Sequence, residues 1–158
     1  MKAASLNELQ KELSTLPTKR ILEICARLIK HKKENKELLT YLLFEAGDEE
    51  SYKKSIKEEV DGQFRDMNKS NLYLAKKSLR KILRTINKFI KYSGSKQTEL
   101  ELRIYYCVKL KASGIAIEKS QVLINLYDNQ LRKIEGALSK LHEDLQFDYK
   151  RELEELSL

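Results

Sequence analysis

The chain has 158 residues and a formal net charge of +7, with 35% charged and 41% hydrophobic residues. It contains only 5 glycines and 1 proline, and Leu, Lys and Glu are abundant, which favours helices throughout. No segment alternates apolar and polar residues convincingly, and none approaches ~18 consecutive apolar residues. These features exclude a membrane-spanning helix and predict an all-α fold of about seven helices, forming a single domain over residues 1–158.

The sequence also favours a cytoplasmic protein. Residues 1–10 lack the apolar core of an export signal. Cys25 and Cys107 both fall in apolar helical stretches, where cysteines are more often reduced core residues than disulfide partners. We therefore expect both thiols to be free.

The chain opens with a short helix at 5–14, where Ser5 and Glu8 have the spacing of a capping box. A helix pair at 18–46 follows. The first helix of this pair carries one apolar stripe, whereas its second helix is apolar on nearly every side. Such a helix must be covered on several sides. We therefore expect residues 38–44 to be central, with Leu42 and Leu43 inaccessible.

A similar pair is predicted at 71–111, after an intervening helix over about 48–67. A shift of 61 residues aligns the first helix of one pair with the first helix of the other. The second helix is again apolar on most sides, with Ile104 and Cys107 expected in the core. Thr98 and Glu101 have capping-box spacing at its start.

Because two such pairs follow one another, residues 17–111 resemble HEAT-like helical-repeat proteins. The resemblance implies antiparallel helix pairs stacked as a HEAT-like repeat. The alternative is an irregular helical bundle in which two amphipathic helices share a pattern by chance.

The C-terminal helical segment, 118–156, contains a 3-4 spacing of apolar residues typical of a coiled-coil seam. The seam consists of Ile124, Tyr127, Leu131, Ile134, Leu138, Leu141 and Leu145. We expect it to pack on residues 72–89 of the same chain. The alternative is self-association, which would make 124–145 the interface of a homodimer.

The positive charge is concentrated in residues 69–111, which carry 12 basic and 2 acidic side chains. The helix predicted at 71–92 has basic residues on the face opposite its apolar stripe. This basic stripe consists of Lys77, Lys81, Arg84, Lys88 and Lys91, with Tyr73 and Tyr92 at its edges. We take these seven residues as the candidate binding site.

Three interpretations of the stripe remain open. Lys and Arg side chains could neutralise phosphates of nucleic acid while a tyrosine stacks on a base. They could instead dock on an acidic protein or a lipid headgroup surface, or form a solvated outer face. Acidic residues of the 48–61 segment would make the stripe structural if they neutralised it.

No pattern of catalytic residues is evident. His31 and His142 lack neighbouring ligands of a recognised metal-site type, and no Gly-rich phosphate loop occurs. We expect no enzyme activity, no cofactor and no metal. The sequence favours a non-enzymatic helical scaffold or adaptor that binds a protein partner or polyanion. The alternative is a sequence-independent nucleic-acid-binding protein that uses the basic 69–111 surface.

Overall fold

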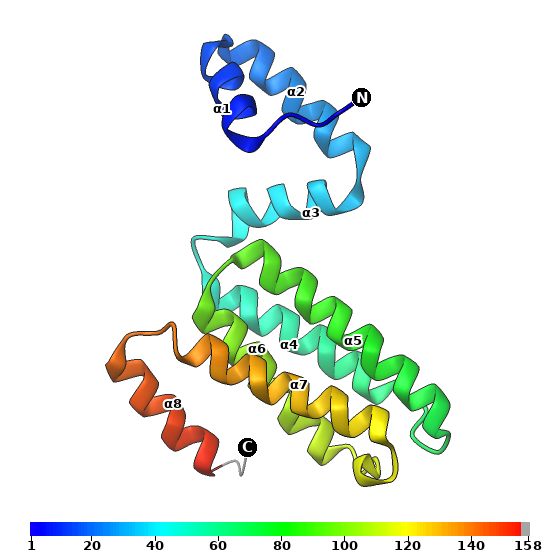
Figure 1. Cartoon of the computed structure of the whole chain (residues 1–158). Coiled ribbons are helices and arrows are strands. Elements are labelled where there is room, and N and C mark those ends of the chain that lie inside the picture. The colour runs from blue at the N-terminus through cyan, green and yellow to red at the C-terminus, as the bar shows by residue number, and fades with distance from the viewer. Residues whose placement is uncertain (156–158) are drawn as a thin grey trace. The chain divides into compact units, whose positions relative to one another are not determined.

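The computed structural model describes residues 1–155, which form eight α-helices and no β-strand (Figure 1). The predicted all-α helical bundle is confirmed, whereas the HEAT-like stacking stays a prediction. The chain divides into two compact units, residues 1–44 and 45–158. The single domain expected from the sequence therefore stays a prediction. Among residues 1–155, no helix combines the length and the apolar character needed to cross a membrane.

The N-terminal unit consists of three short helices. They are α1 (Leu6–Thr15), α2 (Thr18–His31) and α3 (Lys33–Thr40), and α3 continues into a π-helical turn (Tyr41–Glu45). The capping box predicted at α1 is present, because the Ser5 side chain accepts from the Glu8 N–H and the Ser5 N–H donates to the Glu8 carboxylate. Helices α2 and α3 pack against each other as the expected pair.

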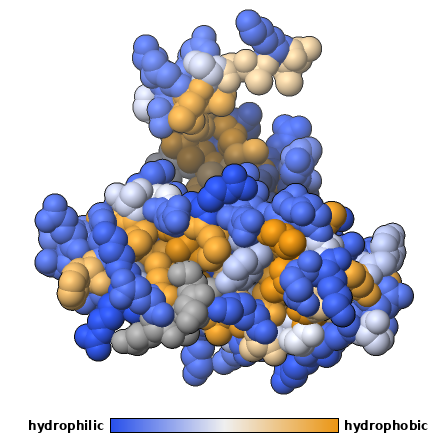
Figure 2. All heavy atoms as spheres, turned by 60° about the horizontal axis from the view of Figure 1, so that its bottom comes forward, coloured by the Kyte–Doolittle hydropathy of each residue, from blue (hydrophilic) through white to orange (hydrophobic). Residues whose placement is uncertain are grey.

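The expected burial of the second helix of this pair is wrong. Leu42 and Leu43 are 56% and 63% exposed, and Tyr41 is the one buried apolar residue of residues 1–44. Two helices in contact can cover each other on one side only, so an all-round apolar helix keeps apolar surface. On the face of the molecule drawn in Figure 2, orange hydrophobic surface alternates with blue hydrophilic surface.

The second unit contains five helices. They are α4 (Glu49–Arg65), α5 (Leu72–Ser93), α6 (Lys96–Ala112), α7 (Gln121–Leu138) and α8 (Glu143–Glu155). Four of them, α4 to α7, enclose an apolar core. Helices α4 and α5 pack on each other and on α6, and α7 packs on α6 (Figure 1). Helix α6 is therefore the centre of this unit. The predicted burial of Ile104 and Cys107 is confirmed.

Helix α6 begins earlier than the sequence pattern indicated. Gly94 ends α5 in the left-handed conformation, with φ 67°, and Ser95 caps α6 by accepting from the Thr98 N–H at 3.2 Å. The predicted box of Thr98 and Glu101 is therefore wrong. Both side chains lie inside α6 and bond to other helices instead.

The expected partner of the C-terminal seam is also wrong, because α7 packs mainly on α6 and not on α5. The side of α6 that α4 and α5 leave open is itself apolar and accepts α7. Ile134 and Leu138 of the seam are buried there, and the homodimer through 124–145 stays a prediction. The predicted segment 118–156 is divided into a 3₁₀ turn (Ile117–Lys119), α7 and α8, and its last residue lies outside the described residues.

The central position of α6 predicts an unequal response to two leucine truncations. Leu102 is buried in α6, so Leu102→Ala should lower the free energy of unfolding by about 2–5 kcal/mol through lost contacts and a residual cavity. Leu74→Ala, at an exposed position of α5, should change it by no more than about 0.5 kcal/mol. Denaturant titration followed by circular dichroism measures both. Equal losses would contradict the packing around α6.

Candidate functional site

Helix α5 positions the candidate site. Its apolar residues Ala75, Leu79, Ile82 and Ile86 are fully buried, which fixes its rotation in the bundle. The start of the helix is held by Asn71, whose Oδ1 accepts from the Tyr73 N–H at 3.0 Å and the Leu74 N–H at 3.1 Å. The opposite face of α5, which carries the basic stripe, therefore points away from the core.

The structure distinguishes between the seven predicted site residues. Lys77, Lys81, Arg84 and Lys91 are exposed, whereas Lys88 is half-buried with its ammonium 4.7 Å from the centroid of the Phe89 ring. Tyr92 is half-buried and packs edge-on against Phe89, with ring centroids 6.1 Å apart. Tyr73 is 74% exposed. The two tyrosines are thus not equivalent, and Tyr73 alone presents its ring to solvent.

Two further cations belong to this surface and were not part of the predicted stripe. Lys76 and Arg80 lie beside it and line an open groove of about 570 Å³ along α5. The groove is lined by Tyr73, Lys76, Lys77, Arg80, Leu83, Arg84 and Asn87. These positions recur every three or four residues, so the same helical periodicity that defined the stripe could have identified them.

Two acidic residues of the neighbouring helices are engaged elsewhere. Asp61 of α4 accepts from the Tyr105 hydroxyl at 2.6 Å and pairs with Lys109 at 2.8 Å. Glu99 of α6 pairs with Lys96 at 2.7 Å and with Arg103 at 2.9 Å. Within residues 1–155, four residues of the stripe form no ion pair. These are Lys77, Lys81, Arg84 and Lys91.

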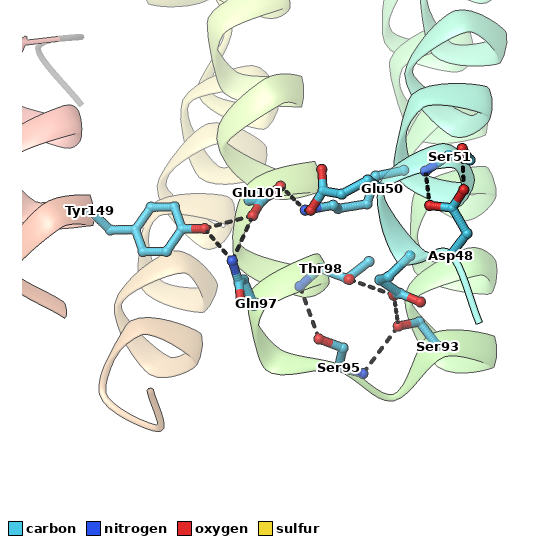
Figure 3. A network of polar contacts seen from close by, with 11 residues as sticks. Asp48, Glu50, Ser51, Ser93, Ser95, Gln97, Thr98, Glu101 and Tyr149 are labelled. Carbon is cyan, nitrogen blue, oxygen red and sulfur yellow. Dashed lines mark hydrogen bonds and ion pairs between the residues drawn. The ribbon is translucent and has the colours of Figure 1, made fainter. Parts of the chain in front are cut away.

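A network of polar contacts at one end of the bundle uses most of the remaining acids (Figure 3). Lys53 of α4 is only 3% exposed, and its Nζ lies 2.5 Å from Glu101 Oε2 and 2.6 Å from Glu50 Oε1. Glu101 Oε1 accepts from the Tyr149 hydroxyl at 2.6 Å and from Gln97 Nε2 at 3.2 Å. This branch joins α4, α6 and α8.

A second branch of the network holds the end of α5. The Glu49 carboxylate accepts hydrogen bonds from the hydroxyls of Ser93 and Thr98, the latter at 2.5 Å (Figure 3). Ser93 Oγ in turn accepts from the Ser95 N–H at 3.2 Å. The start of α4, the end of α5 and the start of α6 are thereby tied together. The sequence pattern does not indicate this network, although Lys53 lies next to Tyr52 on the apolar side of α4.

The pKa shifts of Glu101 and Lys53 both favour the charged form of the side chain. Burial alone would raise the pKa of Glu101, but hydrogen bonds from Lys53 and Tyr149 hold it below its usual value. Burial alone would lower the pKa of Lys53, but hydrogen bonds to Glu101 and Glu50 raise it. Both groups are therefore ionised at neutral pH. Each charge has its partners, so the network is a structural ion pair that sets the position of the helices.

Other reactive groups offer no comparable site. Burial raises the pKa of the Cys107 thiol to about 12, so it is neutral at physiological pH. Across the described part of the chain, no three His, Cys, Asp or Glu side chains converge as a metal ion would require. Comparisons with protein families, with curated proteins and with solved structures find no match. Function is therefore inferred from the basic face of α5.

Glu101 predicts a specific dependence of stability on pH. Because its pKa is lower in the folded state, its contribution is present above the pKa of the unfolded chain and is lost as pH falls through the folded pKa. Glu101→Gln should lower the free energy of unfolding at neutral pH by about 1–3 kcal/mol. The variant should also lose less stability on acidification below about pH 4.5 than the native protein does.

Denaturant titrations from neutral to acidic pH measure this effect. Glu58→Gln is the matched control, because Glu58 is exposed and forms no hydrogen bond or ion pair within the described residues. It should leave the pH dependence unchanged. A Glu101→Gln profile parallel to that of the native protein would contradict the role given to the ion pair.

Proposed function

We propose that this protein is a non-enzymatic helical scaffold that binds a polyanion through α5, and that the polyanion is nucleic acid. One observation carries the proposal. Helix α5 has seven Lys and Arg residues and no acidic residue. Its exposed cations point away from the core, and four of them form no ion pair within residues 1–155.

The arrangement of these charges supports a phosphate backbone as the partner. Lys77 and Lys91 are 14 positions apart, which is a length of about 21 Å along the helix. Cations repeated over such a length match charges repeated along a strand, and their binding releases condensed counterions. Long, flexible lysine side chains reach phosphates in many geometries. Binding is therefore independent of sequence.

The other polyanionic surfaces are less well matched. Membrane-surface helices insert an apolar face between lipid headgroups, but the apolar face of α5 is buried among the other helices of its unit. Protein interfaces usually have an apolar centre with a polar rim. The basic stripe of α5 instead consists of charged residues, and Tyr73 and Leu83 are the two aromatic or apolar side chains that line the groove beside it. Nucleic acid is the partner class that needs no apolar surface beyond a ring on which to stack.

The proposal predicts that charge reversal on α5 abolishes binding. The triple variant Lys77→Glu, Lys81→Glu, Arg84→Glu should lose detectable affinity for labelled oligonucleotide at low salt, because repulsion replaces three phosphate contacts. The association constant of the native protein should fall as salt rises. For each phosphate contact, its logarithm should decrease by about 0.7 per log unit of salt concentration on a single strand and by about 0.9 on duplex. Fluorescence anisotropy measures both quantities.

The matched control reverses Arg132, Lys133 and Lys140, which are exposed and lie in or just after α7. This variant has the same net charge as the α5 variant and should retain most of the native affinity. Circular dichroism checks that both variants fold. Absence of binding by the native protein would remove nucleic acid as the partner, and equal losses in both variants would remove α5 as the site. Binding to anionic vesicles with none to oligonucleotide would favour a lipid surface instead.

A further inference from the structure

The groove on α5 combines cations with an aromatic ring at one end. Tyr73 lies in the first turn of the helix, and Lys76, Lys77, Arg80 and Arg84 follow along the next three turns. Leu83, which is buried, supplies an apolar part of the lining. A solvated row of lysines needs neither the ring nor the hollow. This combination suits a ligand that has both phosphates and a flat apolar face.

The backbone of Tyr73 is held by hydrogen bonds, whereas its side chain is accessible to solvent. The Asn71 cap accepts hydrogen bonds from its N–H and from that of Leu74, which holds the first turn of α5. Its side chain is 74% exposed, and within residues 1–155 its ring makes no aromatic contact and its hydroxyl no hydrogen bond. Both conditions favour stacking, because the ring is accessible and the backbone that carries it is already ordered.

The far end of the groove is held by a buried side chain. Arg103 of α6 is buried, and its Nη1 donates to Asn87 Oδ1 at 3.1 Å and to Gln130 Oε1 at 2.8 Å. Asn87 therefore has a fixed position in the groove lining. From Tyr73 to Arg84 the helix rises about 16 Å, which corresponds to about five nucleotides at the ~3.4 Å spacing of a stacked strand.

We propose that this groove binds single-stranded nucleic acid in preference to duplex, with Tyr73 stacked on an unpaired base and the four cations on the flanking phosphates. The proposal rests on the function proposed above and deepens it by naming the form of the nucleic acid. In a duplex each base face is covered by its neighbours, so the Tyr73 ring has nothing on which to stack. A single strand offers such faces in every sequence.

The test measures single-strand and duplex affinity separately. Tyr73→Ala should weaken binding of a labelled mixed-sequence single strand by roughly 5- to 100-fold, which is the typical contribution of one stacked base. Tyr73→Ala should change the affinity for duplex by less than about 2-fold, because duplex is bound through phosphate contacts alone. Tyr73→Phe keeps the ring and should bind as the native protein does. Phe147→Ala is the matched control, because Phe147 is also an exposed aromatic residue but lies in α8. It should not change the affinity for either form of nucleic acid.

A second readout does not depend on affinity. The chain contains no tryptophan, so Tyr73→Trp introduces one fluorophore at the proposed stacking position. A single strand should quench its emission, and duplex at equal occupancy should not.

The outcomes separate the two proposals. No binding by the native protein would overturn both. Native binding with equal effects of Tyr73→Ala on the two forms, or with no effect on either, would overturn the single-strand preference alone. Absence of quenching at saturation would do the same.

Discussion

Burial of the apolar side of α5 against α4 and α6 is the constraint on which the rest of this structure depends. Leu79, Ile82 and Ile86 are inaccessible, so the rotation of α5 about its own axis is fixed. A helix with a fixed rotation has a fixed outer face, and every basic residue outside the apolar arc must point toward solvent. The core thus determines the direction in which the charge points.

The positive charge of the α5 face also depends on where the acidic residues of α4 and α6 form their contacts. Glu49 and Glu101 accept hydrogen bonds inside the end network, and Asp61 and Glu99 pair with cations of α6. A buried ammonium such as Lys53 requires a carboxylate partner, because an unpaired charge in the core is strongly destabilising. The contacts that stabilise the bundle therefore occupy these four carboxylates, and none of these contacts involves the stripe.

Periodicity predicted much of this architecture. The amphipathic α5, the central α6 and the outward direction of Lys77, Lys81 and Arg84 all follow from the spacing of apolar residues. Spacing does not say which neighbour covers a helix, and so the exposure of Leu42 and Leu43 and the packing of α7 on α6 were not foreseen. The Lys53–Glu101 pair joins residues 48 positions apart, and no local pattern indicates such a contact. Lys76 and Arg80 lie beside the narrow arc of the predicted stripe, within the same helical periodicity.

The central claim is that nucleic acid contacts the α5 face and not the surface as a whole. Lysine acetylation read by mass spectrometry tests it most directly, with the native protein alone and saturated with single-stranded oligonucleotide. The account predicts that Lys76, Lys77 and Lys81 are protected by the oligonucleotide. Lys133 and Lys140, which are exposed, should keep their reactivity. Equal protection of all five lysines, or protection that leaves α5 reactive, would contradict it.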